Sequence, residues 1–271
     1  MTWPTDKDVR VTSRGYETPD GLKPRVTTIL KVLGLGTDAL IRWSADLERD
    51  AVLEAAGDVY AHGEHGTPDE FVSAVRARVG PARQHQRKLS KAADIGSSIH
   101  NMIQWTLKGE LGEKQGPKPQ MPEEAAWAFM AWKAWWAGAR LVPVRIEQPV
   151  WTDRYAGTVD LIARAEDGNL EVWDWKSGKG IYESYHLQVA AYAAAASRFA
   201  GEPVLIGGIV RVPKVVGDPD VEVRRVGDCR YDYKDRDGVQ HKGGTDYNYA
   251  QLMDGFNAAL TLYEMFAKEA K

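Results

Sequence analysis

The sequence predicts an α/β protein with a helical N-terminal portion, and two kinds of pattern support this class. Apolar residues recur at helical spacing in several segments. These segments are residues 24–60, 91–108, 122–139, 183–200 and 247–268. Short runs rich in β-branched and aromatic residues predict the strands. They read VPVRIEQPVW, AGTVDLIARA, LEVWDWKS and PVLIGGIVRVP. We expect one domain, 1–271, with a mainly helical portion at 1–121 and a sheet-containing core at 122–271.

The order of signals in the first half predicts helices joined by loops. PRVTTILKVLG and TDALIRWSADLERDAVLEAA make up the first helical segment, and the loop AHGEHGTPD follows at 61–69. A basic run then leads into the helix at 91–108. The apolar face of that helix comprises Ile95, Ile99, Met102 and Ile103. GELGEKQGPKPQMP at 109–122 is rich in glycine and proline and ends it.

The second half shows the alternation of strands and helices that builds a sheet. The turn EDGN at 166–169 joins two strand patterns and predicts a hairpin. The helix at 183–200 carries a run of alanines, which permits close packing on a sheet. Residues 217–247 are polar and rich in turn formers, so we expect a hairpin or surface excursion there.

Composition excludes several classes of protein. The formal net charge is −3, so any site for an anion must be a local patch. The single cysteine, Cys229, excludes an intramolecular disulfide, a cysteine-built zinc site and a cysteine-ligated iron–sulfur cluster. The N-terminal MTWPTDKDVR has no apolar run, and no stretch approaches the roughly 20 apolar residues of a membrane span. We expect a cytoplasmic protein that binds no membrane.

Three charged residues stand inside apolar strand sequences. Asp160 lies in GTVDLIA, and Asp174 and Lys176 lie in LEVWDWKS. Because side chains alternate along a strand, Asp174 and Lys176 share a face. The predicted hairpin brings Asp160 within cross-strand reach of them, and Glu147 lies on the strand before.

This combination of acids and a lysine has two interpretations. Carboxylates that converge on one face repel each other unless a cation neutralises them, and oxygen ligands suit Mg²⁺ or Mn²⁺. A lysine beside such a cation orients or deprotonates an attacking water, or stabilises a pentavalent phosphate. The set then serves phosphodiester hydrolysis. The alternative is a buried Asp–Lys ion pair with an acid at a turn, and these residues alone leave both open.

Three further features favour the hydrolytic interpretation. His100 lies in GSSIH on the helix at 91–108, one turn after Gly96. Gln188 and Tyr192 lie four residues apart, so they share a face of the helix that follows the DWK strand. The third feature is the order of these motifs: His, acid, Gly-x-x-Asp, Asp-x-Lys, Gln-x-x-x-Tyr.

This ordered set resembles the PD-(D/E)XK nuclease superfamily, in its RecB-like exonuclease branch. GSSIH, IEQPVW, YAGTVDLIA, VWDWKSGKG and HLQVAAY carry the resemblance over about a third of the chain. The early VTTIL and Trp43 are similar to the openings of phage and mitochondrial genome-maintenance exonucleases. The resemblance implies a restriction-endonuclease-like core, with a central mixed β-sheet flanked by helices. It also implies a metal-dependent DNA exonuclease of recombination, repair or replication, of phage origin.

The resemblance assigns a role to each motif residue and implies Mg²⁺ or Mn²⁺ as cofactor. The implied metal ligands are His100, Asp160, Asp174 and the backbone carbonyl of Trp175. Lys176 is the implied catalytic lysine and acts with the two aspartates. Glu147 either binds a second metal or only supports its strand, and Gln188 and Tyr192 brace the site or touch DNA. The CRISPR-associated relatives hold an iron–sulfur cluster with four cysteines, so Cys229 alone excludes that subtype.

DNA, single-stranded or with duplex ends, is the expected partner, together with a recombination or replication protein. A local run of cations directly precedes the His100 helix and either lines one wall of the cleft or is an ordinary solvated face. It comprises Arg76, Arg78, Arg83, Arg87, Lys88 and Lys91. Lys179, in a loop without nucleotide-binding spacing, is a further candidate for the DNA backbone. Tyr182, Tyr185 and Tyr192 are near enough in sequence to offer stacking surfaces.

Two alternatives remain beside the exonuclease. A structure-specific endonuclease would use the same residues. A non-catalytic DNA-end-binding protein would use the fold alone, but the intact set of Asp160, Asp174 and Lys176 argues against it. His62, Glu64 and His65 fit no zinc helix motif, and we expect a loop without metal there.

Overall fold

The computed structural model describes residues 2–269, apart from short gaps. The gaps are residues 6, 36, 64–65, 82, 213–220, 226–232, 235–239 and 242–246. Cys229, Glu64, His65 and most of the predicted excursion at 217–247 therefore lie outside the described residues. The chain divides into two compact units. The sheet unit comprises Met1–Leu33 and Ile95–Lys271, and the helical unit comprises Gly34–Asp94.

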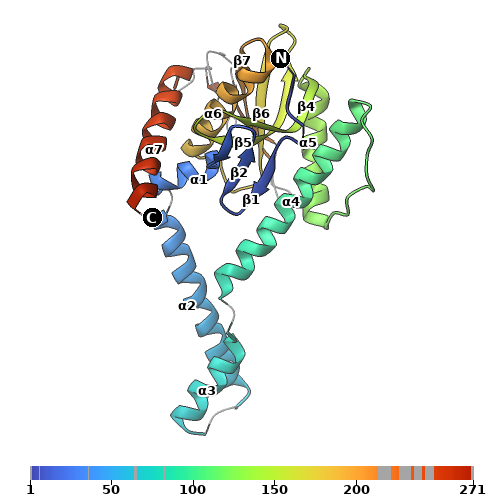
Figure 1. Ribbon diagram of the computed structural model, residues 1–271. Helices are drawn as coiled ribbons and strands as arrows, with labels where there is room; N and C mark the ends of the chain where they lie inside the picture. The colour runs from blue at the N-terminus through green and yellow to red at the C-terminus, as the bar shows by residue number, and fades with distance from the viewer. Residues whose placement is uncertain are drawn as a thin grey trace. The chain divides into compact units, whose positions relative to one another are not determined.

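A five-stranded mixed sheet forms the centre of the sheet unit (Figure 1), in the order β4-β5-β6-β7-β8. Its strands are β4 (Val142–Trp151), β5 (Ala156–Arg164), β6 (Leu170–Lys176), β7 (Val204–Arg211) and β8 (Glu222–Arg225). Neighbouring strands are antiparallel except β6 and β7, which are parallel. A parallel pair needs a crossover, and the helix α6 (Glu183–Ala200) supplies it. The predicted strands, hairpin and helix at 183–200 are thus confirmed.

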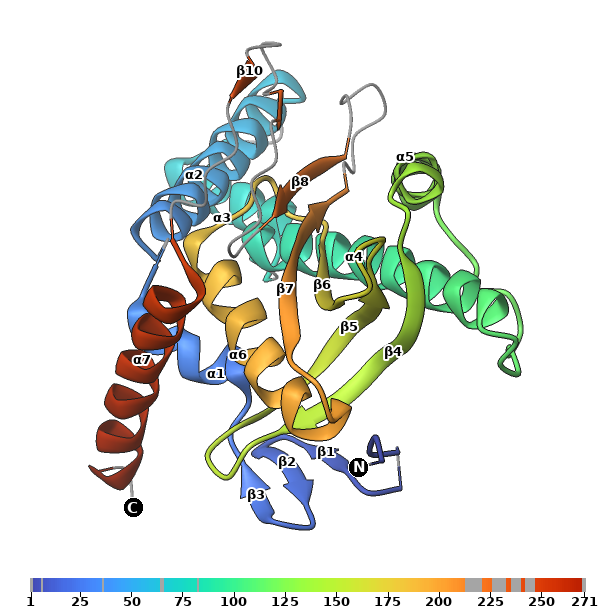
Figure 2. The same ribbon diagram turned by 90° about the horizontal axis from the view of Figure 1, so that it is seen from above.

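Helices cover both faces of this sheet (Figure 2). On one face, α6 packs with α1 (Val26–Leu30) and α7 (Tyr249–Glu269) over a core that includes Val172 and Ile162. Most of the α6 alanines are buried and let the helix approach the strands closely. On the other face lie the sheet-unit part of α4 (Gln84–Glu110) and α5 (Glu123–Gly138). A mixed sheet flanked by helices, as in a restriction-endonuclease-like core, is therefore present.

A tryptophan cluster packs α5 against the face of β6 that lies opposite α6. Trp132 is fully buried, lies 5.6 Å from the stacked ring of Trp136 and meets Trp175 edge-on at 5.8 Å. Trp135 contacts both Trp173 and Trp175 at 5.6 and 5.9 Å. The Trp-rich segment at 122–139 is therefore a packing helix, and it makes the strand that carries Asp174 rigid.

The first residues form a small sheet that the sequence patterns did not predict. Its strands are β1 (Arg10–Thr12), β2 (Gly15–Thr18) and β3 (Gly21–Lys23). A Cβ at Gly15 would lie 2.2 Å from the carbonyl oxygen of Lys23, so the turn from β1 to β2 requires glycine. Tyr16 shares a 2.9 Å hydrogen bond with Thr158, which ties this sheet to β5. The short helix η1 (Lys31–Leu33) follows α1.

The helical unit contains α2 (Thr37–Ala61), α3 (Pro68–Val79) and the first part of α4. The predicted end of the loop at residue 69 is wrong, because α3 already begins at Pro68. Thr67 and Glu70 form a reciprocal capping box there, with proline at the first helical position. That T-x-x-E signal was readable in the sequence. Two short strands, β9 (Tyr233–Lys234) and β10 (Gln240–His241), complete the described elements.

No helix among the described residues is long and apolar enough to cross a membrane.

Candidate active site

Asp160 and Asp174 lie opposite each other where two strands stop pairing. The β5–β6 ladder runs from Arg164 and Leu170 to Leu161 and Trp173, and the next opposed positions are Asp160 and Asp174. No backbone pairing is present between these two positions. The strands therefore stop pairing at the acids, and the Asp160 carboxylate accepts the Trp175 N–H there instead of a backbone carbonyl.

Glu147 extends this row onto the third strand. The β4–β5 pairing continues on both sides of Glu147, which places it opposite Asp160. Its φ is 48°, in the left-handed region that residues other than glycine seldom adopt. Such a conformation costs on the order of 1–3 kcal/mol and clusters at functional sites. We call Glu147, Asp160 and Asp174 the acidic row.

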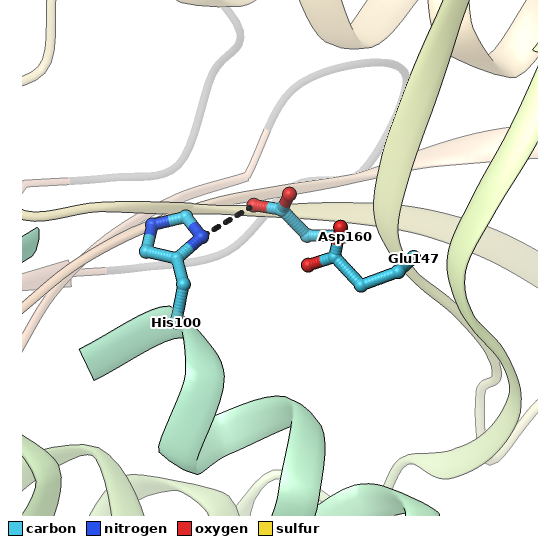
Figure 3. Close-up of side chains that lie close together, drawn as sticks. All are labelled: His100, Glu147 and Asp160. Atoms are coloured by element: carbon cyan, nitrogen blue, oxygen red, sulfur yellow. Dashed lines mark ion pairs between the residues drawn. The ribbon is translucent and has the colours of Figure 1, made fainter. Parts of the chain in front are cut away.

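His100 reaches the row from α4 (Figure 3). Its Nδ1 lies 3.8 Å from Asp160 Oδ2, which is too long for a hydrogen bond. Potential ligand atoms of His100, Glu147 and Asp160 all lie within 4.8 Å of one another. Asp174, which the sequence predicted as a ligand, is not part of this group, and Glu147 takes that place.

Asp174 is instead the most deeply buried acid of the row, at 2% exposure. Its Oδ1 accepts a 2.9 Å hydrogen bond from Gln188 Nε2. Its Oδ2 forms an ion pair with Lys176 Nζ at 2.6 Å and has no other partner among the described residues. A buried carboxylate oxygen with remaining acceptor capacity is what a further cation would satisfy.

Gln188 connects the charged pair to α6. Its amide donates to Asp174 and, at 3.2 Å, to the hydroxyl of Tyr192, and its Oε1 accepts from Lys176 Nζ at 3.2 Å. Gln188 and Tyr192 are 6% and 4% exposed. Of the two roles the sequence left open for these residues, bracing fits their burial and direct DNA contact does not.

Gly157 makes room for this brace. A Cβ at Gly157 would lie 2.3 Å from Cε1 of Tyr192, far inside any normal contact. The glycine of the Gly-x-x-Asp motif therefore lets the Tyr192 ring pack on β5. Sequence reasoning assigned it no role, although a glycine within a strand signals close approach of another group.

The backbone of Trp175 faces the open end of the β5–β6 ladder. Its N–H donates a 2.7 Å hydrogen bond to Asp160 Oδ2. The carbonyl of Lys176 accepts from the Val212 N–H, so it points toward β7. Successive carbonyls on a strand point to opposite edges, and that of Trp175 therefore points toward Asp160, where the predicted ligand was expected.

The family comparison gives the class of protein in which this arrangement belongs. Residues 68–242, more than half of the chain, match the family model of the PD-(D/E)XK nuclease superfamily. The chain belongs to this superfamily. The match includes the acidic row, His100 and Lys176. No curated protein matches the chain.

PD-(D/E)XK nucleases use divalent metal ions, typically Mg²⁺ or Mn²⁺. The donor set of this member fits such an ion, since carboxylate oxygens dominate it and one imidazole nitrogen is present. Ligand atoms on one Mg²⁺ lie about 3–4 Å apart, from metal–oxygen distances of about 2.1 Å. The ligand atoms of His100, Glu147 and Asp160, within 4.8 Å of one another, lie near that spacing.

The electrostatics of the row also favour a cation. Burial, together with the charges of Asp160 and Asp174, raises the pKa of Glu147 to about 8. Burial likewise raises the pKa of Asp174 to about 6, against the opposing effect of Lys176. Burial alone would lower the pKa of Lys176, but the neighbouring aspartates outweigh it and raise that pKa. The nuclease thus holds a charged ammonium beside acids that repel one another.

The remaining predicted DNA contacts lie outside this cluster. Lys179 is exposed on the loop after β6. Arg83, Arg87 and Lys88 are exposed and belong to the helical unit, whereas His100 belongs to the sheet unit. The position of the basic run along a wall of the cleft therefore stays a prediction.

Proposed function

We propose that this protein is a metal-dependent DNA exonuclease of the RecB-like branch. Its superfamily makes it a nuclease. The convergence of His100 and the acidic row with a lysine–aspartate pair carries the proposal of metal-dependent hydrolysis. The resemblance of the ordered motifs carries the choice of a RecB-like exonuclease. A protein that only bound DNA ends would gain nothing from acids whose burial and mutual repulsion raise their pKa values.

The metal site in this proposal is formed by residues from four elements. They are His100, Glu147, Asp160, Asp174 and the carbonyl of Trp175. The bound ion would lower the pKa of a coordinated water and offset charge at phosphorus. The Trp175 N–H fixes the orientation of the Asp160 carboxylate, and Gln188 fixes that of Asp174.

Lys176 acts on the scissile phosphate in this proposal. Its side chain is 18% exposed, and Asp174 holds its ammonium in place. The same contact keeps the lysine protonated, and a protonated ammonium stabilises negative charge that develops on the phosphoryl oxygens. Gln188 Oε1 holds Nζ on the side of α6, which prevents it from swinging away from the row.

A structure-specific endonuclease remains the second candidate, because the same residues would serve it. Participation in DNA recombination, repair or replication, a protein partner from those processes, a cytoplasmic location and a phage origin are further proposals. They rest on the resemblance of the ordered motifs.

The test is a time course on end-labelled single-stranded and duplex DNA with Mg²⁺, Mn²⁺ or EDTA. We expect metal-dependent products that shorten progressively from one end, and intact closed circles. Cleavage of closed circles would instead establish the endonuclease. A preparation of Asp160→Asn should be purified and assayed in parallel. Equal activity in both preparations, or none in the wild type with any metal, would contradict the proposed chemistry.

A further inference from the structure

Two tyrosines continue the line of the catalytic groups toward the surface. The Lys176 ammonium lies 4.6 Å from the ring centroid of Tyr185, and the Tyr182 ring meets Tyr185 edge-to-face at 5.5 Å. Exposure rises along this line, from 2% for Asp174 to 51% for Tyr182. A path therefore leads from the buried acid over the lysine to an exposed aromatic ring.

Tyr182 begins α6 without the side-chain hydrogen bond that usually caps the N-terminus of a helix. Tyr182 is the N-cap residue, and its side chain makes no capping hydrogen bond. Serine, threonine, aspartate and asparagine are preferred there because their side chains accept from the free N–H groups of the first turn. An exposed aromatic ring at a position that favours a small polar residue calls for a reason other than stability.

The other tyrosines near the site are already engaged. Tyr192 is buried against Gly157 and bonded to Gln188. Tyr185 is partly buried and has the Lys176 ammonium over its ring. Among these three tyrosines, Tyr182 alone offers a largely exposed ring.

We propose that Tyr182 stacks on an unpaired base of the DNA strand whose phosphate lies at Lys176. This inference rests on the proposed nuclease function and adds a substrate class: single strands or frayed ends. A base is joined to its phosphate through the sugar, and the sequence of lysine, Tyr185 and Tyr182 follows the same order outward. A base inside a duplex has its faces covered by its neighbours, so only an unstacked base can use the ring. Stacking is tolerant of base identity, since every base has a π-face.

The test compares the binding of two protein variants to two DNA strands. Wild type and Tyr182→Ser are each titrated, in EDTA, with oligothymidine and with an abasic deoxyribose-phosphate strand of equal length. Both strands carry the same phosphates, so the difference between them measures contacts to bases. We expect Tyr182→Ser to lower affinity for oligothymidine by about 5- to 150-fold, the range for loss of one base–aromatic stack. Affinity for the abasic strand should change little. Tyr182→Phe, which keeps the ring, should bind both strands like wild type.

Stability and a matched control separate this role from a structural one. Because serine is a better N-cap, Tyr182→Ser should unfold at the same or a higher temperature than wild type. Tyr249→Ser removes a 40% exposed tyrosine from the first turn of another helix, α7, and should leave both affinities unchanged. Equal losses on both strands, or no loss on either, would overturn the proposal.

The measurement is independent of cleavage. If wild type binds oligothymidine better than the abasic strand and Tyr182→Ser does not, the stacking inference holds. If that same wild type cleaves neither strand with Mg²⁺ or Mn²⁺, the nuclease proposal alone fails.

Discussion

Strand β6 has two faces that are stabilised in opposite ways. Toward α6 it presents Asp174 and Lys176, which are held by an ion pair and by Gln188. Toward α4 and α5 it presents Trp173 and Trp175, which pack in a cluster of aromatic rings. The aromatic face makes the strand rigid mainly through ring packing, with one hydrogen bond from Trp173 Nε1 to Glu171. That rigidity lets the other face keep acids whose mutual repulsion would otherwise push them apart.

We expect substitutions on the charged face to change turnover and substitutions on the aromatic face to change the free energy of unfolding. On the charged face, the proposed function adds contacts to a cation and a phosphate to the ion pair and the Gln188 hydrogen bonds of the free protein. On the aromatic face, the ring contacts are already formed in the free protein. Each of the following variants tests whether the two faces can be separated.

The largest effect is expected from Lys176→Met, which removes the ammonium and keeps the aliphatic stem. Turnover should fall by about 10²–10⁴, the scale for a positioned catalytic group, because nothing replaces the charge near the phosphoryl oxygens. DNA affinity should change far less. Steady-state kinetics and binding titrations check this, with Lys133→Met, an exposed lysine on α5, as the control. Should Lys176→Met unfold the protein, the ion pair would be structural and the catalytic role would lose its support.

On the opposite face, Trp132→Ala should lower the free energy of unfolding by about 3–5 kcal/mol. The side chain is fully buried and stacked, so its removal leaves a large cavity. Metal affinity of the folded fraction should be retained. Urea unfolding compares it with Trp127→Ala, a 42% exposed tryptophan on the same helix that should change stability by less than about 1 kcal/mol. Equal losses in both variants would contradict the packing role of the cluster.

Gly157→Ala tests the contact between β5 and the Tyr192 ring of α6. The new methyl group would overlap the Tyr192 ring, so stability should fall by about 1–3 kcal/mol. Displacement of the ring would also disturb Gln188 and, through it, Asp174. A double-mutant cycle with Tyr192→Ala checks the mechanism, because the alanine at 157 should cost little once the ring is absent. Additive losses would mean that Gly157 is required for another reason.

The sequence predicted the strands, the hairpin and the positions of Asp160 and Asp174 because local patterns determine them. Alternation puts Asp174 and Lys176 on one face, and hairpin register then brings Asp160 opposite. The sequence left the role of Glu147 undecided. Its positive φ within a strand depends on tertiary contacts that no local pattern encodes. The role of Gly157 likewise depends on a ring thirty-five positions later in the chain.

Two other differences had readable causes. The capping box at Thr67 marks the start of α3, but the glycines and histidines before it favour a loop through residue 69. The N-terminal sheet uses strands of three or four residues, too short for alternation to show.

The smallest effect is expected from the basic run, which lies outside the acidic row. If Arg83, Arg87 and Lys88 contact phosphates, their replacement by glutamate should weaken DNA binding and flatten its dependence on salt. Each lost phosphate contact reduces the slope of log affinity against log salt by about 0.7–0.9, since fewer counterions are released. Metal binding should persist, because the ligands belong to the sheet unit.

A matched triple variant isolates this effect from the change in net charge. Lys114, Lys118 and Lys133 are exposed lysines of the sheet unit, and their replacement by glutamate alters the total charge equally. Titrations at several salt concentrations should give a shallower line for the Arg83, Arg87 and Lys88 variant than for this control. Parallel lines of equal affinity for the two variants would make the basic run an ordinary solvated face. DNA would then be held by cations near the row itself, of which Lys179 is the first to test.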